Sequence, residues 1–288
     1  MRELFGKPIR LADRSLVESA AEMLRCVEKD GQRVAFLVVG DPLCATTHTD
    51  LILRCREKKI PTEVVHNASI MNAVSSCGLQ LYRFGEVCTS LQQQVSLPFW
   101  TARWKPESFF DKIEDNRKRG CHTLCLLDIQ VKERSEENMV KGRMDIFEPP
   151  RYMSIPQALS QLSQIVDRRQ EEVEAASSKE TDEQVTTSKD KEDPPTPSTT
   201  STTSEGEAEA ENETTTATST QKHWLQQEKN IVGIARLGAS DECIRCGTVE
   251  ELINAEFGPP LHALVIPADD LHECEQDYID FYRGQVEN

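Results

Sequence analysis

The sequence has 288 residues, 38% of them hydrophobic, and a formal net charge of −16 at pH 7. This length allows two domains of ordinary size, but the hydrophobic fraction is low for a chain that is folded throughout. The acidic balance argues against nucleic acid as a main partner. No stretch approaches the roughly 20 apolar residues that span a bilayer, and the first residues lack the apolar segment of a signal peptide. We therefore expect a cytoplasmic protein with no membrane partner.

The first part of the chain alternates between helical and strand-like patterns. In chain order these patterns predict a helix over 15–27, a strand over 33–39, a helix over 45–57, a strand over 61–66 and a turn and helix over 67–78. Ser15 and Glu18 have capping-box spacing at the start of the first helix. Both strands are apolar on both faces, which is typical of a parallel sheet covered by helices. Residues 1–72 are thus predicted to form an N-terminal α/β domain.

A second α/β domain is predicted over residues 73–168 and 223–288. A helix is expected over 105–120, stopped by Gly120, and another after a cap at Ser154. Apolar runs predict strands over 79–87, 95–100, 122–131, 230–239 and 261–267.

An acidic segment over 169–222 separates the two parts of this second domain. It has no aromatic residue and only two large aliphatic ones, Val173 and Val185, and its fourteen acids face five bases. Such a composition cannot bury enough apolar surface to offset chain entropy. We predict a disordered insert, and its net charge of −9 leaves the rest of the chain only mildly acidic.

The ten cysteines include two close pairs. Cys121 with Cys125 and Cys243 with Cys246 could together supply four zinc ligands. Cys125, however, lies in a strand-like run where cysteine acts as a small hydrophobic residue. We expect no metal site.

Polar groups follow several of the predicted strands. Asp41 follows the strand over 33–39, residues 67–70 follow the second strand, and Asp128 and residues 236–239 follow two later ones. Ligands of a parallel sheet bind outside the carboxyl ends of its strands, so these groups are expected at one edge. Asp41 could contact a ribose hydroxyl or a cationic ligand, or it could cap the helix after Pro42.

Several blocks, in order, resemble the diphthine synthase family: "AFLVVGDPLCATTHTDLILR", "PTEVVHNASIMNAV", "CGLQLYRFGE", "FWTARWKPESFFDKI", "HTLCLLDI" and "EPPRYMS". The resemblance covers nearly all of the chain except the insert. It implies the tetrapyrrole-methylase-like fold, with two α/β domains, a cleft between them and usually a homodimer. It also implies an S-adenosylmethionine-dependent methyltransferase that acts on a modified histidine of translation elongation factor 2. The eukaryotic members methylate both the amine and the carboxylate of that side chain.

The resemblance also implies a set of cofactor-binding positions, and it gives no residue that would deprotonate the amine. These positions are Asp41, Cys44, Ser69, Ile70, Leu127, Leu237 and His262.

The chain departs from the family pattern at its start. The family opens with a strand and a glycine-rich turn of the form "IGLGLGD", which this sequence does not contain, and Cys44 stands where the family has glycine. We therefore expect a first domain without its opening strand. Two hypotheses follow: an active methyltransferase, or a noncatalytic relic or isoform that acts as a binding or dimerising subunit.

Overall fold

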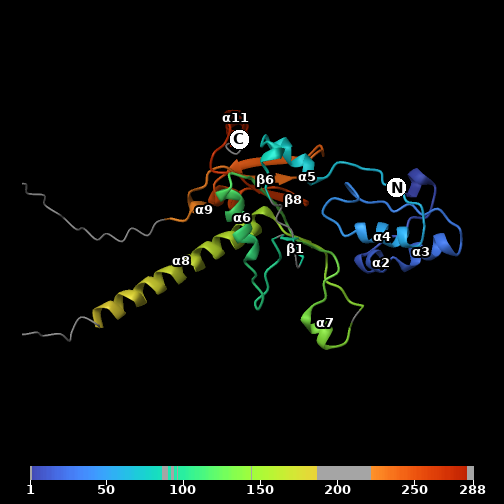
Figure 1. The fold of residues 1–288 in the computed structure, drawn as a ribbon, viewed down its shortest axis with the longest axis horizontal. Coiled ribbons are helices and arrows are strands. Elements are labelled where there is room, and N and C mark those ends of the chain that lie inside the picture. Colours follow the sequence, from blue (N-terminus) through green and yellow to red (C-terminus); the bar gives the residue numbers. More distant parts are fainter. Residues whose placement is uncertain are drawn as a thin grey trace, which may run out of the picture.

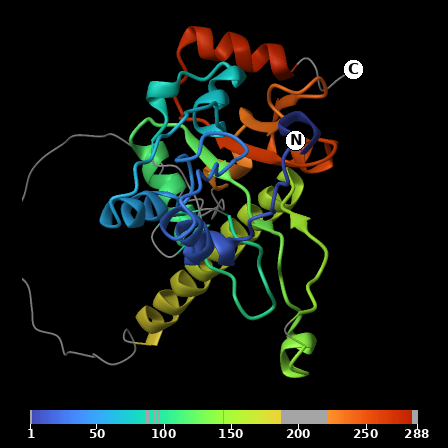
Figure 2. The ribbon, with the colours of Figure 1, turned by 90° about the vertical axis from the view of Figure 1, so that its right-hand side faces the viewer.

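A computed structural model of the chain describes residues 2–85, 90–91, 94–95, 97–143, 145–186 and 222–283. Its centre is a four-stranded sheet with helices packed on both faces (Figures 1 and 2). The α/β class expected from the sequence is confirmed. The N-terminal segments, blue in Figure 1, gather beside this centre and are joined to it by an extended stretch that leads into α5.

The central sheet has the order β3-β8-β6-β7 and is antiparallel at every pair. Its strands are β3 (Thr123–Leu126), β6 (Ile231–Ala235), β7 (Cys243–Gly247) and β8 (His262–Ile266). The expectation of a parallel sheet is wrong here. Residues 236–242 are too few for the crossover that parallel neighbours require, so β6 and β7 pair as antiparallel strands.

Alternate residues of each strand enter two separate cores. One face packs against α6 (Ser108–Lys118), α8 (Ile155–Thr186) and α10 (Val249–Asn254), and the other against α5 (Ile70–Ala73) and α11 (Glu273–Arg283). Figure 2 shows α11 and α8 on opposite sides of the sheet. The first core takes Cys125, Ile231 and Leu264, and the second takes Leu124, Val232 and Val265.

Helix α8 confirms its predicted start and corrects the predicted start of the insert. Ser154 and Gln157 form a reciprocal cap, with the Gln157 amide 3.3 Å from the Ser154 hydroxyl and the Ser154 amide 3.0 Å from the Gln157 side chain. The helix then continues to Thr186, so residues 169–186 are helical rather than disordered. Their many Glu, Gln, Arg, Lys and Ala residues have high helix propensity and extend a helix that is already nucleated. The rest of the predicted insert, 187–221, lies outside the described residues.

Shorter elements complete the second part of the chain. The predicted strand over 79–87 is wrong where it is described, because Leu81–Arg83 form a 3₁₀ turn (η2) and Phe84 makes only an isolated bridge to His122. A 3₁₀ turn over Val74–Cys77 (η1) ends at Gly78, whose φ of 89° confirms it as a stop. The remaining elements are β1 (Ser90–Leu91), β2 (Gln94–Val95), β4 (Ile129–Gln130), β5 (Arg151–Tyr152), α7 (Glu136–Val140) and α9 (Trp224–Gln227).

The described residues of the N-terminal segment form four helices and a small core of their own. The helices are α1 (Arg2–Phe5), α2 (Arg14–Ser19), α3 (Ala21–Glu28) and α4 (Thr49–Glu57), and the core comprises Ala20, Leu24 and Cys55. The single helix predicted over 15–27 is split at Ala20, which has a φ of 51°. The predicted capping box of Ser15 and Glu18 is also wrong, since the carboxylate of Asp13 caps α2 by accepting from the Leu16 amide at 2.9 Å.

Neither predicted strand of the N-terminal segment forms. Residues 33–39 and 61–66 have no regular secondary structure and join no ladder among the described residues. Val39 is 99% exposed and Val65 is 76% exposed. Apolar composition favours a strand, but a strand also needs a neighbour for its backbone hydrogen bonds, and neither segment pairs with the other.

Candidate functional site

Three predicted cofactor positions lie at one edge of the central sheet. β3 and β6 run in the same direction with antiparallel β8 between them, so the carboxyl ends of β3 and β6 adjoin the amino end of β8. Leu127 directly follows β3, Leu237 follows β6 by two residues, and His262 opens β8. With neighbouring strands about 4.8 Å apart, the three positions span about 10 Å of the edge. We call this place the β3–β8–β6 edge.

His262 presents a buried hydrogen-bond acceptor at this edge. Its Nε2 lies 3.2 Å from the carbonyl oxygens of both Gly258 and Pro259, and a carbonyl can only accept, so Nε2 carries the proton. Burial lowers the pKa of His262, which keeps the ring neutral. Nδ1 is then a bare acceptor, and it is buried with no partner in the described part of the chain. A ligand that donates an N–H or O–H would satisfy it.

Ser69 and Ile70 stand at the start of α5, which packs on one face of the sheet. The Ser69 hydroxyl caps α5 by accepting from the Met71 amide at 3.2 Å, and the Asn72 side chain accepts from the Ser69 amide at 2.8 Å. Ile70 packs against the core beneath α5 and α11, and Leu237 packs against that core too. The helix cap fixes Ser69 and Ile70 at the start of α5, and Ile70 packs against the same core as Leu237.

Asp41 joins two segments of the N-terminal region. Its carboxylate, 7% exposed, accepts from the Leu43 amide at 2.8 Å, the Asn67 amide at 3.2 Å and the His66 Nδ1 at 2.9 Å. The Leu43 amide, followed by the His66 ring, lowers the pKa of Asp41 to about 2. Asp41 is therefore a charged turn residue. It does not cap α4, because that helix begins only at Thr49.

Cys44 lies in the turn that Asp41 organises. Its amide is 3.4 Å from the Asp41 carbonyl, and its thiol is free and half-buried. The hydrogen bonds of the Asp41 side chain join it to residues 43, 66 and 67 rather than to the β3–β8–β6 edge. The turn that contains Asp41 and Cys44 is thus linked to Ser69 by the Asp41–Asn67 hydrogen bond, since Asn67 lies two residues before Ser69.

Sequence reasoning did not identify His66 as part of this arrangement. The residue precedes the "NAS" turn, and its side chain is 69% exposed while its Nδ1 contacts Asp41. The two residues are 25 positions apart, so no local spacing could reveal the pair.

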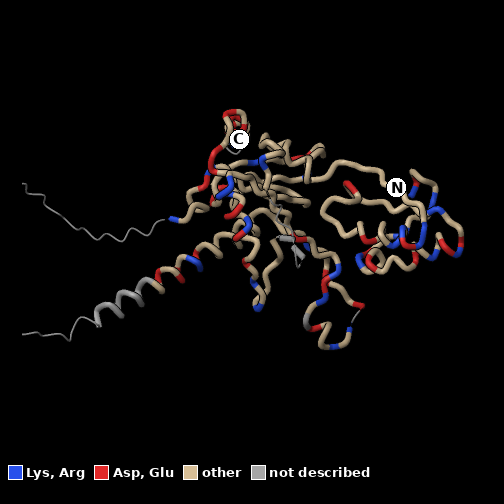
Figure 3. The backbone as a smooth tube through the Cα atoms, viewed as in Figure 1, with Lys and Arg blue, Asp and Glu red and all other residues tan. Residues whose placement is uncertain are grey.

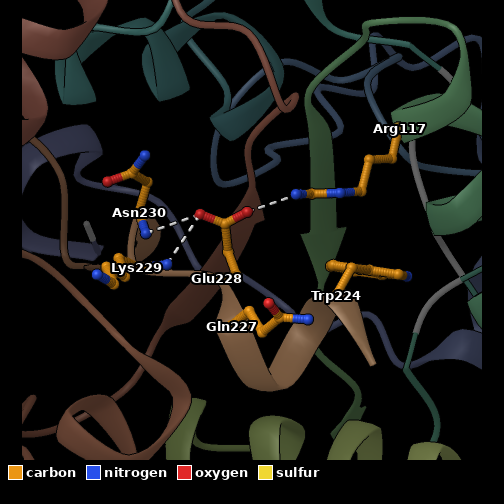
Figure 4. A pocket seen from close by; sticks show the side chains of 6 residues that line it. All are labelled: Arg117, Trp224, Gln227, Glu228, Lys229 and Asn230. Carbon is orange, nitrogen blue, oxygen red and sulfur yellow. Dashed lines mark hydrogen bonds and ion pairs between the residues drawn. The ribbon is translucent and has the colours of Figure 1, made fainter. Parts of the chain in front are cut away.

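A cavity of about 340 Å³ opens elsewhere on the molecule (Figure 4). The Arg117 guanidinium stacks 4.4 Å above the Trp224 ring and pairs with Glu228 at 2.7 Å, and Glu228 also accepts from the amides of Lys229 and Asn230. Asn230 precedes β6, whereas Leu237 follows it, so the cavity lies at the opposite end of the strand from the predicted positions. Arg117 and Glu228 pair with each other, and we do not assign the cavity to the site.

Comparison with known proteins identifies the family. The profile of the Tetrapyrrole (Corrin/Porphyrin) Methylases matches residues 4–187. The diphthine methyl ester synthase of Candida glabrata is 44% identical over 97% of this chain and 74% of that protein. The enzyme of the same name from Mus musculus is 43% identical over 98% of this chain and 80% of that protein. This chain belongs to the diphthine synthase family.

A solved structure supports the same conclusion for the fold. The crystal structure of a diphthine synthase from Entamoeba histolytica has a TM-score of 0.63 and 30% sequence identity, covering 98% of this chain and 80% of that one. Membership of the diphthine synthase family makes the chain a methyltransferase of diphthamide biosynthesis, which needs a methyl donor and a protein substrate.

The described residues contain no group of three or more His, Cys, Asp or Glu placed to hold a metal ion. Within the described ranges, no helix combines the length and apolarity needed to cross a bilayer.

Proposed function

We propose that this diphthine synthase family member transfers methyl groups from S-adenosylmethionine to the modified histidine of translation elongation factor 2, giving diphthine methyl ester. The observation that carries the cofactor assignment is the buried Nδ1 of His262, an acceptor with no partner among the described residues. A nucleoside ligand with amino groups supplies the donor that this atom lacks.

The chain's own residues bind and orient the ligand. Leu127 packs into the core beneath α6, α8 and α10, Leu237 and Ile70 pack against the core on the other face, and Asp41 holds the turn of residues 40–44 against the residues before Ser69. Adenosylmethionine supplies an activated methyl group on a sulfonium. The protein then has to hold a nucleophile in line at about 3 to 3.5 Å, and such positioning can supply much of the rate enhancement.

We further propose that the chain acts in the cytoplasm, where elongation factor 2 works, and that it forms a homodimer. Along the described chain Lys and Arg are interleaved with Asp and Glu, as Figure 3 shows. This mixture of both charges along the chain suits a protein substrate better than nucleic acid. Light scattering coupled to size exclusion measures the oligomeric state directly.

The proposed function is tested with adenosylhomocysteine and with methyl transfer. Calorimetry of the chain with adenosylhomocysteine should give one site per protomer, and His262→Gln should weaken it. His272→Gln is the matched control, since His272 is exposed, lies beyond the other end of β8, and its Nδ1 accepts from the Cys274 amide at 3.3 Å. Elongation factor 2 from cells that lack this step should gain methyl groups, detected by mass spectrometry. Absence of both binding and methylation would contradict the proposal.

The noncatalytic hypothesis has one observation in its favour. The apolar segments 33–39 and 61–66 pair with no strand in the described part of the chain, and Val39 is 99% exposed. A binding or dimerising subunit would assemble with a second copy, or with elongation factor 2, without binding adenosylhomocysteine. The same calorimetry separates the two functions.

A further inference from the structure

Arg236 connects the two loops that flank the β3–β8–β6 edge. Its side chain is 14% exposed, and Nε donates to the Asp241 carboxylate at 2.6 Å. Nη2 donates to the Asp241 carbonyl at 2.7 Å. These bonds close the turn after β6, in which Leu237 lies.

The same guanidinium holds the loop that precedes His262. Nη1 donates to the Phe257 carbonyl at 2.7 Å and also to the Pro259 carbonyl. The Pro259 carbonyl is one of the two that accept from the His262 Nε2. Arg236 and His262 therefore share an acceptor, and the position of that carbonyl depends on the arginine.

Gly258 shows how closely the arginine approaches this loop. Its φ is 70°, which a side chain rarely adopts. An added Cβ would lie 3.1 Å from the Arg236 Nη2. Arg236 itself has a φ of 51°, an uncommon conformation for a residue with a side chain. Both residues of this contact, Arg236 and Gly258, thus have a positive φ where the guanidinium lies against the loop.

We propose that Arg236 is a positioning residue that holds the loop over 257–261 so that His262 keeps its proton on Nε2 and offers Nδ1 to an N–H of the methyl donor. This inference rests on the proposed function. It adds the direction of the hydrogen bond, in which the ligand donates and the His262 Nδ1 accepts. Lysine cannot replace Arg236, since an ammonium lacks the planar fork that reaches the Asp241 and Phe257 carbonyls together.

The test compares Arg236→Lys with Arg283→Lys. Arg283 likewise donates to a backbone carbonyl, that of Lys229 at 3.0 Å, and pairs with Asp280 at 3.1 Å. Its partner Lys229 precedes β6, at the other end of the strand from Arg236. Calorimetry with adenosylhomocysteine should show about a tenfold rise in Kd for Arg236→Lys, equivalent to about 1.4 kcal/mol, and less than a twofold change for Arg283→Lys.

Two further readouts separate positioning from general stability. ¹⁵N NMR of the His262 ring should show a single Nε2–H tautomer in the wild-type chain and a mixture of tautomers in Arg236→Lys. In methyl transfer, KM for the donor should rise while kcat at saturation stays within twofold. Should Arg236→Lys fail to fold, Asp241→Asn removes the carboxylate partner while keeping the arginine, and it should shift Kd in the same direction by less.

Two results would overturn the inference: an unchanged tautomer and Kd in Arg236→Lys, or an equal loss of affinity in Arg283→Lys. A wild-type chain that does not bind adenosylhomocysteine would instead overturn the proposed function and the ligand contact with it. The NMR comparison would still decide whether Arg236 positions His262.

Discussion

Replacing Glu275 by glutamine tests whether a buried carboxylate fastens α11 to the sheet. The Glu275 side chain is fully buried and pairs with the Arg83 Nη1 at 2.6 Å and the His122 Nε2 at 3.0 Å. It also accepts from the amides of Gln80 and His272, both at 2.9 Å. Glutamine has nearly the same shape, but it brings an NH₂ group that would face these donors.

The size of the effect follows from the ionisation of Glu275. Burial raises the pKa of this carboxyl, but the amides of Gln80 and His272 and then the His122 ring outweigh burial and lower the pKa from 4.5 to about 2. At about 1.4 kcal/mol per pKa unit, the charged form is stabilised by about 3 kcal/mol. Breaking a buried ion pair typically costs about 3 to 5 kcal/mol, which agrees. We expect Glu275→Gln to lower the free energy of unfolding by about 3 kcal/mol.

Urea unfolding followed by circular dichroism measures this change. Glu273→Gln is the matched control, because Glu273 lies in the first turn of the same helix and is exposed, so it feels the same helix dipole without the buried contacts. We expect the control to change stability by less than about 0.5 kcal/mol. A loss below about 1 kcal/mol in Glu275→Gln, or equal losses in both variants, would refute the reasoning.

The pH dependence of stability provides a second check on the same network. The pKa of Glu275 is depressed in the folded state, so its contribution is present above 4.5 and is lost as the pH falls from 4.5 towards 2. Burial also lowers the pKa of His122, so stability should already decline as the pH falls below 6.5. Glu275→Gln should abolish the part of the decline that belongs to Glu275, and an unchanged acid limb would count against the assignment.

Three further predictions concern packing and the site. Gly78→Ala should lower the melting temperature, because φ is 89° and the new Cβ would lie 2.2 Å from the Tyr278 Cβ; an unchanged melting temperature would contradict the close approach of α11. Leu162 is fully buried, so Leu162→Ala should lower the free energy of unfolding, measured with urea, by about 2 to 5 kcal/mol. A loss below about 1 kcal/mol would contradict this and indicate that the core collapses around the gap. Asp41→Ala should weaken adenosylhomocysteine binding in calorimetry because Asn67 loses an acceptor; unchanged affinity would leave Asp41 a turn residue alone.

Local patterns were sufficient to find most strands of the central sheet but not their directions. The apolar runs around β3, β6 and β8 predict strands correctly, and Ser154 predicts the start of α8. β7 was missed because Arg245 interrupts its apolar run and its two cysteines suggested metal spacing instead. A strand buried on both faces occurs in covered antiparallel sheets as well as in parallel ones, so composition does not determine direction.

The N-terminal strands show the limit of propensity more sharply. Residues 33–39 contain six consecutive apolar residues and remain unpaired, with Leu37 48% exposed. Strand formation depends on a neighbour that supplies backbone hydrogen bonds and covers both faces, and this requirement is not contained in the segment itself. Helix α4 forms in the same region because its hydrogen bonds are local.

The sequence predicts the positions of the candidate site but not the contacts that its residues make. Leu127, Leu237 and His262 lie at one edge because two strands that flank an antiparallel neighbour run in the same direction. Their role in binding a cofactor stays a prediction. Arg236 could not be identified in the same way. It bonds to backbone carbonyls 21 and 23 residues further along the chain, and every residue has such a carbonyl. Only the folded arrangement distinguishes this arginine from the others, and only there does the bare Nδ1 of His262 become visible as a site for a donor.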